Sequence, residues 1–218
     1  MISSILWDMD GVLVETSEAH YQSWVVAFKH FGYDFNREYF LRYYGMNDTS
    51  TVRGFLSTSI SSELTQAIGE YKEDWFRDHI KDQIHLLPGV TDWLAKFRER
   101  GYLQAVASSG PLENIDLIVT STNIHGYFSA LVSCADGPTK PDPWVFQEAA
   151  RKLGSAPSEC LVIEDTPNGV SAARNACMHC LAVTTSNPND ALKQADLVVY
   201  NLSKLNWQAF EEHFLQEN

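Results

Sequence analysis

The sequence predicts an α/β protein. It indicates a Rossmann-like core, with a parallel sheet covered by helices, and a small all-helical domain inserted after the first strand. Three observations support this fold class. Strand and helix patterns alternate from Pro88 onward, polar residues stand at the ends of the predicted strands, and residues 15–85 show helical patterns only. Repeated strand–helix alternation is typical of a parallel sheet with helices on both faces.

The first predicted strand ends at two aspartates. Ile5 and Leu6 suit a buried strand, and the break at Asp10-Gly11 suits its C-terminal end. The carboxylates of Asp8 and Asp10 stand one residue apart in the sequence and repel each other, so a partner that compensates their charge is expected. A divalent cation is the natural partner, and ligands that are all oxygen favour magnesium over zinc.

Calcium-binding loops and solvated turns can also contain Asp-x-Asp-Gly. A calcium loop of the EF-hand type needs oxygen ligands at alternating positions and a glutamate at its twelfth position. Counted from Asp8, those positions hold Val12, Val14 and Ala19, so the calcium loop is excluded. The surface turn stays open on this motif alone and depends on the rest of the chain.

The helical insertion comes next in the chain. An apolar stripe with spacings of four, three and four residues predicts an amphipathic helix, and its members are Leu64, Ile68, Tyr71 and Trp75. We therefore expect a discontinuous core domain of residues 1–14 and 86–218 and a helical cap domain of residues 15–85. Two connections, near Val14 and Leu86, would let the domains open and close about a hinge.

The remaining elements alternate along the chain. One helix is marked by Val90 and ends near Gly101, a second is marked by Leu112, and a third opens at Asp142-Pro143 and ends near Gly154. Strands are predicted at residues 103–107, 130–134, 160–163, 181–183 and 197–200, with helices between them.

Polar residues follow several of these strands. Ser108 and Ser109 come after the second predicted strand, Lys140 lies in the loop after the third, and Glu164-Asp165 follows the fourth. In an open parallel sheet, ligands bind beyond the C-terminal ends of the strands. We therefore expect these side chains to gather with the two aspartates at one edge of the sheet.

The order of these residues resembles the four motifs of the haloacid dehalogenase superfamily of phosphohydrolases and phosphomutases. The resemblance covers nearly the whole chain and is carried by WDMDGVLVE, PGVTDWLAKFRERGY, VASSGPLENI, KPDPWVF and VIEDTPNGVSAARNA. It is closest to the helical-cap subfamily that includes β-phosphoglucomutase and small-sugar phosphatases. The resemblance implies a magnesium-dependent phosphoric monoester hydrolase that acts on a small phosphorylated metabolite.

The resemblance also implies roles for the residues of the first motif. Asp8 would attack phosphorus and form an aspartyl phosphate, which divides a difficult hydrolysis into two easier steps. Asp10 would be the general acid for the leaving alcohol and then the general base for water. Both residues would belong to the magnesium site, Asp10 through its backbone carbonyl.

The later motifs would bind phosphate and metal. Ser108 and the backbone of Ser109 would bind phosphoryl oxygens, and Lys140 would neutralise charge between the nucleophile and the phosphoryl group. Asp165 would bind magnesium directly, with Glu164 as a second ligand or its neighbour. Each residue alone has an ordinary alternative, namely a turn serine, a solvated lysine or a helix N-cap, so the assignment depends on the whole set.

The cap residues would contact the substrate. His20 and Trp24 lie four apart on one predicted helix face, at positions that β-phosphoglucomutases also fill with His and Trp. A histidine that only packs in the core is the alternative. Gly45 and Asn47 belong to a loop that matches the substrate loop of the cap.

One departure from the mutase pattern favours hydrolysis. The mutase has basic residues in its cap loop, including an arginine that holds the non-reacting phosphate, whereas this sequence has Tyr44 and Asp48; Arg42 and Arg53 are out of register. A mutase binds a bisphosphate in two orientations and needs cations at both ends. The mutase stays the same-fold alternative. A non-catalytic phosphate-dependent switch is a different alternative, which the helical insertion and Asp10 disfavour.

The bulk properties exclude several classes of partner. A net charge of −12 disfavours nucleic acid and anionic membranes, which need a basic face. No apolar run reaches membrane-span length, and cleavage of a signal peptide would remove the first motif at Asp8, so we expect a cytosolic protein, with a monomer as the default.

Cys177 and Cys180 form a lone Cys-x-x-Cys, which favours small packing residues over a zinc or redox site.

Overall fold

A computed structural model describes residues 1–81, 83–135 and 137–215. Within these residues the core is a parallel sheet of six strands in the order β3-β2-β1-β4-β5-β6. The strands are β1 (Ser4–Trp7), β2 (Leu103–Ser108), β3 (Ala130–Ser133), β4 (Cys160–Glu164), β5 (His179–Val183) and β6 (Leu197–Val199). Every strand pair is parallel. The predicted α/β fold class is therefore confirmed.

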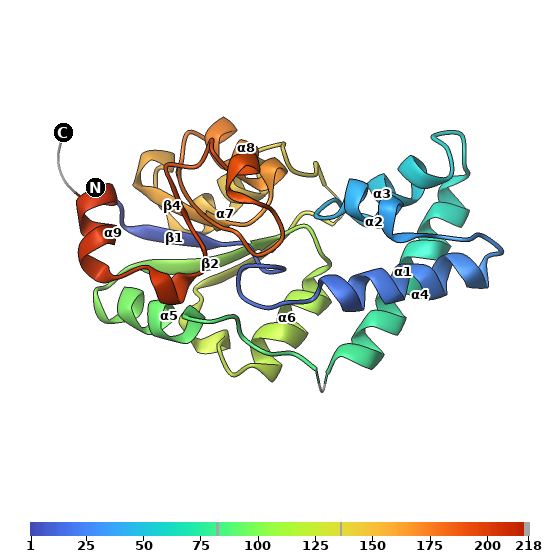
Figure 1. Cartoon of the computed structure of the whole chain (residues 1–218), viewed down its shortest axis with the longest axis horizontal. Coiled ribbons are helices and arrows are strands. Elements are labelled where there is room, and N and C mark those ends of the chain that lie inside the picture. The colour runs from blue at the N-terminus through green and yellow to red at the C-terminus, as the bar shows by residue number, and fades with distance from the viewer. Residues whose placement is uncertain (82, 136, 216–218) are drawn as a thin grey trace.

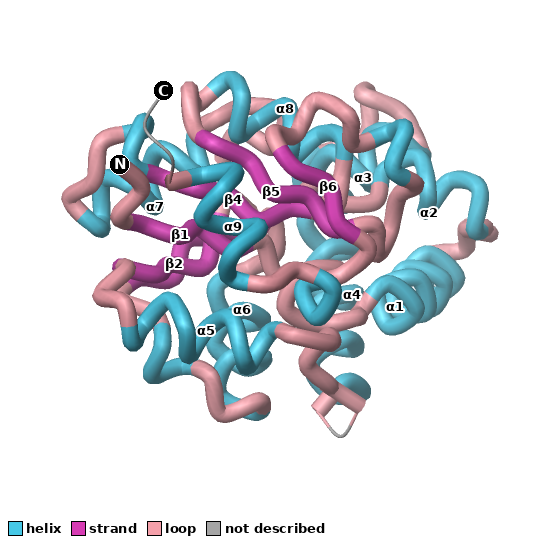
Figure 2. The backbone as a smooth tube through the Cα atoms, turned by 60° about the vertical axis from the view of Figure 1, so that its left-hand side comes forward, coloured by secondary structure: helices cyan, strands magenta, loops and turns pink. Residues whose placement is uncertain are grey.

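Helices cover both faces of the sheet (Figure 2). They are α5 (Val90–Glu99), α6 (Leu112–Ser121), α7 (Trp144–Leu153), α8 (Pro167–Asn175) and α9 (Trp207–Phe214). Successive side chains of a strand point to opposite faces, so Ile5 and Trp7 pack in one cluster with α5, α6 and α9, while Leu6 packs in another with α7 and α8. Both faces of β1 are therefore covered by apolar side chains, which explains why three of its four residues are apolar.

The inserted segment folds as helices beyond the C-terminal end of β1 (Figure 1). These helices are α1 (Ser17–His30), α2 (Arg37–Tyr43), α3 (Asp48–Phe55) and α4 (Ser62–Ile80). They pack around an apolar cluster of their own, centred on Trp24, Phe28 and Ile68. A small helical unit inserted after the first strand is thus present as expected.

One predicted element is wrong. The sequence prediction placed a helix between the strands now seen as β5 and β6, but that connection contains only a 3-10 turn at Asn189–Ala191. Pro188 precedes the turn, and Leu192 is the fully buried apolar residue that follows it. A segment with no apolar stripe has nothing to pack against the sheet as a helix.

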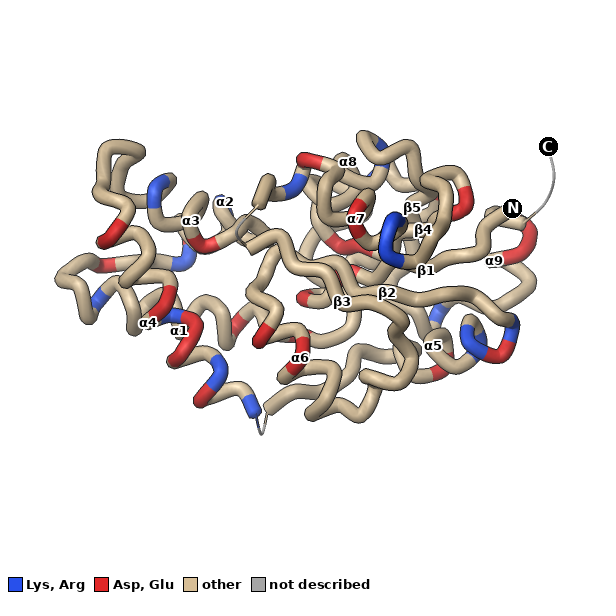
Figure 3. Tube along the Cα trace, turned by 180° about the vertical axis from the view of Figure 1, so that it is seen from behind, with Lys and Arg blue, Asp and Glu red and all other residues tan. Residues whose placement is uncertain are grey.

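The charges of the molecule are spread over both parts. Figure 3 shows Asp and Glu on the core helices and on the cap helices, interspersed with Lys and Arg. None of the helices that the structure describes is both long and apolar enough to cross a membrane. Cys177 and Cys180 are both free thiols, one exposed and one buried.

Candidate active site

The site begins in the loop that follows β1. Asp8 is buried next to the strand end, and Gly11 turns the chain with a φ of +84°. A Cβ atom at Gly11 would lie 2.0 Å from Oδ2 of Asp165, so only glycine fits between the two loops. The glycine behind the two aspartates therefore lets the loops after β1 and β4 approach each other closely.

Lys140 ties three strand ends together. Its Nζ donates to Oδ1 of Asp8 at 2.6 Å and to Oε1 of Glu164 at 2.8 Å, and we call these three residues the core triad. Burial alone would lower the pKa of Lys140, but the two carboxylates outweigh burial and raise it. The lysine therefore carries its charge at neutral pH and holds the carboxylate of Asp8 in place.

Asp8 titrates far above an ordinary aspartate. Burial raises its pKa to about 7; Lys140 opposes the rise, while Glu164 and Asp10 add to it. Three carboxylates around one ammonium leave excess negative charge, which an additional cation would compensate.

Asp165 is the clearest sign of a metal site. Its two carboxylate oxygens are buried and have no hydrogen-bond partner among the described residues. Burial, with Glu164 and Asp8 adding to its effect, raises the pKa of Asp165 well above its usual value, although the nearby hydroxyl of Ser186 and the charge of Lys140 oppose the rise. Oxygens of Asp8, Glu164 and Asp165 lie within 4.8 Å of one another. This all-carboxylate set fits a hard divalent cation such as magnesium.

Glu164 differs from its two neighbours in the acidic cluster. Its Oε1 receives the Lys140 ammonium, and its Oε2 accepts from the amides of Asp165 at 2.7 Å and Thr166 at 2.8 Å. Gly169 leaves the room for this carboxylate, because a Cβ there would lie 1.7 Å from Oε1. The free oxygens for a cation are therefore those of Asp165 and Asp8, and Glu164 orients Lys140.

The side chain of Asp10 points away from this cluster. Its Oδ1 accepts from the hydroxyl of Thr16, and it lies 3.2 Å from Nε2 of His20. Burial would raise the pKa of Asp10, but His20 and Thr16, with help from Lys72, lower it. Asp10 is thus ionised in this arrangement, with a histidine from the cap at hydrogen-bond distance.

The predicted phosphate-binding residues lie at the end of β2. Ser108 is the last residue of that strand, and its Oγ accepts from the amide of Gly110 at 3.1 Å. Ser108, Ser109 and Lys140 line the same pocket as Asp8. The structure therefore brings the three loops together, as convergence of parallel strand ends requires.

The pocket lies between the core and the cap and has a volume of about 670 Å³, counting solvent at its mouth. Nine of the eleven predicted site residues line this pocket, and two lie outside its lining. The residues that line it are Asp8, Asp10, His20, Trp24, Gly45, Ser108, Ser109, Lys140 and Glu164. Asn47 and Asp165 lie outside this lining, the latter behind Gly11.

The predicted cap residues differ in what they contact. His20 stacks on Phe76 with ring centroids 4.1 Å apart and also reaches Asp10, so it is more than a packing residue. Trp24 is 5% exposed and belongs to both the cap core and the pocket wall. Asn47 caps α3 and donates from Nδ2 to the carbonyl of Gly137 at 3.2 Å, which joins the cap loop to the core.

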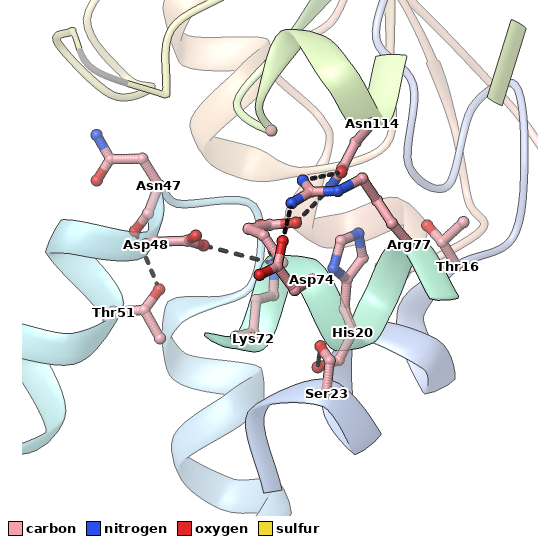
Figure 4. A network of polar contacts seen from close by, with 12 residues as sticks. Thr16, His20, Ser23, Asn47, Asp48, Thr51, Lys72, Asp74, Arg77 and Asn114 are labelled. Atoms are coloured by element: carbon pink, nitrogen blue, oxygen red, sulfur yellow. Dashed lines mark hydrogen bonds and ion pairs between the residues drawn. The ribbon is translucent and has the colours of Figure 1, made fainter. Parts of the chain in front are cut away.

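Several residues of the site were not predicted from the sequence. Lys72 forms ion pairs with Glu73 and with Asp48, and we call these three the cap triad. Asn114, from the core helix α6, donates to Oε2 of Glu73 at 2.5 Å and accepts from Arg77 at 3.1 Å (Figure 4). The contact between Glu73 and Asn114 therefore joins cap and core at a second place, besides the contact of Asn47 with Gly137.

A sequence signal for this second cluster did exist. The apolar stripe that predicted α4 passed through Tyr71 and Trp75. The face of the helix that is buried in the structure instead carries Ile68, Phe76 and Ile80. Lys72 stands on that face and is 3% exposed. A charged residue in the middle of an apolar row with four-residue spacing predicts a buried ion pair.

Comparison with known proteins agrees with this geometry. Residues 5–183 match the family described as haloacid dehalogenase-like hydrolase. The chain belongs to this family. It is 28% identical over 226 residues to β-phosphoglucomutase of Bacillus subtilis, covering 99% of this chain and 96% of the mutase. It is 23% identical over 224 residues to validoxylamine A 7'-phosphate phosphatase of Streptomyces hygroscopicus subsp. limoneus, covering 95% and 97%.

Two further likenesses bear on fold and length. A crystal structure of β-phosphoglucomutase from Clostridium difficile matches with a TM-score of 0.89 at 24% identity, covering 99% of this chain and 98% of the other, which shows the shared fold. The chain is also 30% identical over 199 residues to Protein SUPPRESSOR OF QUENCHING 1, chloroplastic, of Arabidopsis thaliana; this covers 89% of the chain but 19% of that protein. The predicted family and the predicted class of enzyme, a phosphoric monoester hydrolase of this family, are confirmed.

Proposed function

We propose that the protein is a magnesium-dependent phosphatase that hydrolyses a small phosphomonoester, a sugar phosphate or a related metabolite, through a phosphorylated Asp8. The observation that carries this proposal is the convergence on one pocket of a lysine-bound Asp8 and an unpartnered Asp165 carboxylate. A buried carboxylate with no donor is costly unless a cation binds it. The pair supports a site for a metal ion and a phosphoryl group side by side.

The first half of the proposed reaction forms an acyl phosphate. A carboxylate oxygen of Asp8 attacks phosphorus, the bond from phosphorus to the ester oxygen breaks, and Asp10 gives a proton to the departing alcohol. Lys140 stands 2.6 Å from Oδ1 of Asp8, where it would neutralise charge on the transferring group. Ser108 would donate to a phosphoryl oxygen from the end of β2.

The second half returns the enzyme to its starting state. Asp10 accepts a proton from water, the water oxygen bonds to phosphorus, and the bond from phosphorus to Asp8 breaks to release phosphate. The lowered pKa of Asp10 keeps its carboxylate ionised, so that it can accept this proton. Its earlier role as an acid needs a proton, and the imidazole of His20, 3.2 Å away, is the nearest group that could hold one.

The proposed magnesium site uses the free oxygens of the acidic cluster. Asp8 and Asp165 would hold the ion with their side chains, and Asp10 would contribute its backbone carbonyl; Glu164 would orient Lys140 beside it. When bound, magnesium would offset the negative charge of the carboxylates and of the phosphoryl group.

The domain boundaries are part of the proposal. Residues 15–85 would move as a cap against a core of residues 1–14 and 86–218, ranges that include residues 82, 136 and 216–218 outside the described part. Val14 and Leu86 form an antiparallel bridge, and the amide of Leu87 donates to the carbonyl of Leu13 at 2.9 Å. Two connections held side by side would act as a hinge. The cytosolic location and the monomeric state stay predictions.

Phosphoryl transfer between two positions of one sugar is the second candidate. The likeness to β-phosphoglucomutases along nearly the whole chain favours it. Against it, Asp48 and Glu73 line the cap half of the pocket, where their negative charge would repel a second phosphate. Hydrolysis therefore remains the first choice.

The test is phosphate release from a panel of sugar phosphates and other small phosphomonoesters, with magnesium and with chelator. We expect release that requires magnesium and falls by about 10⁴-fold in Asp8→Asn, because the nucleophile is lost. Near wild-type turnover by that variant would overturn the mechanism. Conversion of glucose 1-phosphate to glucose 6-phosphate that depends on a bisphosphate primer, without net release, would favour the mutase.

A further inference from the structure

The cap half of the pocket contains a charge cluster for which the proposed reaction has no use. The ammonium of Lys72 lies 3.5 Å from Oδ1 of Asp48 and forms a closer ion pair with Glu73. The lysine side chain is 4% exposed and also faces the ring of Trp24, with its Nζ 5.2 Å from the centroid. All three members of the cap triad line the pocket, so a bound substrate meets them.

Glu73 is fully occupied by protein groups. Its Oε1 accepts from Lys72 and its Oε2 accepts from Asn114 at 2.5 Å, and its side chain is 6% exposed. Asn114 in turn is held by Arg77. Figure 4 shows Arg77 directed toward Asn114 on one side of the network, and Lys72 directed toward Asp48 on the other. Glu73 therefore neutralises Lys72 and has little capacity left for a ligand.

Asp48 is the member of the triad that remains available. It is the first residue of α3, its side chain is 27% exposed, and within the described part of the chain its carboxylate accepts one hydrogen bond, the 3.5 Å contact with Lys72. A carboxylate offers about four acceptor positions, so most of those on Asp48 are not used by the described residues, and the residue lines the pocket.

The charge of the cap half is negative. The triad has two carboxylates and one ammonium, and Lys72 and Lys140 are the basic residues among the described lining of the pocket apart from His20. Burial raises the pKa of Asp48 to about 7, with Lys72 opposing the rise and Glu73 adding to it. Above that pH the triad carries one uncompensated negative charge, which a buried site can hold only at a cost.

We propose that Asp48 determines the substrate class: the enzyme takes phosphomonoesters whose end remote from the phosphate carries hydroxyl or amino groups, and rejects those with a carboxylate or a second phosphate there. The inference rests on the proposed function, because the phosphate must sit at Asp8 for the remote end to reach the cap. Hydroxyl and ammonium groups donate to the free oxygens of Asp48. An anionic group at the remote end is repelled by the negative charge of Asp48, and neither of the two groups can donate a hydrogen bond to the other.

The test compares two substrates that differ only at the remote end. Sorbitol 6-phosphate and 6-phosphogluconate share chain length and phosphate position, and they carry a hydroxyl and a carboxylate, respectively, at carbon 1. At pH 8 we expect a ratio of kcat/KM of about 30 in favour of sorbitol 6-phosphate, falling below about 3 in Asp48→Asn. The ratio does not depend on the fraction of folded enzyme, so partial misfolding of the variant cannot imitate the effect.

A matched control is Asp78→Asn, which removes the same charge from an exposed position on α4 outside the pocket. It should leave the ratio unchanged. Glucosamine 6-phosphate should be hydrolysed at least as well as glucose 6-phosphate by wild type. The inference would be overturned if wild type had nearly equal kcat/KM for sorbitol 6-phosphate and 6-phosphogluconate. It would also be overturned if the ratio of these two values were the same in wild type and Asp48→Asn.

Binding separates this inference from the proposed function. Dissociation constants of the same two compounds for Asp8→Asn, measured by calorimetry with magnesium, should show the same preference without turnover. Preferential binding of sorbitol 6-phosphate without release of phosphate by wild type would reject the phosphatase and keep the role of Asp48. Phosphate release by wild type, with equal binding of both compounds, would keep the phosphatase and reject the role of Asp48.

Discussion

The two sides of the pocket hold charge triads of the same composition. Each consists of a buried lysine between two carboxylates, but the core triad is built on strand ends and the cap triad on helices. The lysine contacts in the core are 2.6 and 2.8 Å long, whereas Lys72 lies 3.5 Å from Asp48. The core triad also adjoins Asp165, whose oxygens have no partner among the described residues.

This difference shows how surroundings decide what a charge cluster does. Beside the core triad, further carboxylates create a deficit of positive charge that favours a cation, and a cation then favours phosphate. Beside the cap triad, Asn114 satisfies the carboxylate of Glu73, whereas Asp48 lines the pocket and accepts only from Lys72 among the described residues. The same combination of one lysine and two carboxylates thus suits catalysis in the core and selection of the substrate in the cap.

Removing the core lysine should have the largest effect. Lys140→Met leaves Asp8 and Glu164 without their common donor, and we expect kcat to fall by about 10³-fold because charge on the transferring group is no longer neutralised. Steady-state kinetics with saturating magnesium would measure it. Lys193→Met, at an exposed position, is the control. A loss below about tenfold would mean that Lys140 is only a structural partner of Glu164.

Removing the cap lysine should affect binding more than chemistry. In Lys72→Met we expect KM to rise by about tenfold with kcat within a few-fold, and stability to fall by about 3 kcal/mol, since two buried carboxylates lose their partner. Kinetics and urea unfolding would measure both effects, with the exposed Lys29→Met as control. A fall in kcat as large as that of Lys140→Met would abolish the distinction between the two triads.

The carboxylate of Asp165, which has no hydrogen-bond partner among the described residues, should make the stability of the metal-free enzyme depend on pH. Because the pKa of Asp165 is raised in the folded state, folding binds a proton there, and stability is lost as pH rises from the unfolded pKa toward the folded one. In chelator at pH 8, Asp165→Asn should therefore melt higher than wild type, by roughly 3–8 °C.

The difference in melting temperature should shrink as the pH falls toward the ordinary pKa of an aspartate, because Asp165 is then protonated in the folded state and increasingly so in the unfolded state. Added magnesium should reverse it, because only the wild type keeps the ligand. Scanning calorimetry at several pH values would follow both effects. A variant that melts below wild type in chelator at pH 8 would show that Asp165 has a stabilising partner other than a metal ion.

The smallest effect should come from the contact between the cap triad and the core helix α6. Asn114→Ala removes the core donor to Glu73 and the acceptor for Arg77, which should raise KM about threefold and lower stability by about 1–2 kcal/mol. Kinetics and thermal unfolding would measure this. Thr122→Ala, at the other end of α6, is the control for a lost side-chain hydrogen bond. Unchanged KM would mean that the Glu73 contact does not help hold the cap on the core.

The core side of this comparison could be predicted from the sequence, and the cap side could not. Asp8, Ser108, Lys140 and Asp165 each follow a strand whose pattern is local, and parallel strands deliver their C-terminal ends to one edge whatever else the chain does. Lys72 and Glu73 are buried only because a particular face of α4 docks beside the core. The apolar stripe through Tyr71 and Trp75 indicated the helix correctly but pointed to a neighbouring face.

The sequence by itself determined the α/β class, the helical insertion and the residues at the strand ends, because each depends on short-range pattern and on the fixed direction of strands in a parallel sheet. Tertiary structure alone decided that Glu164 orients Lys140, that Asp165 has no hydrogen-bond partner among the described residues, and that Asp48 lines the pocket with most of its acceptor positions unused by them. Those properties depend on which groups from distant segments lie within hydrogen-bond distance of each carboxylate in the folded protein. Hydrogen-bond partners and burial are set by packing, and no local pattern encodes them.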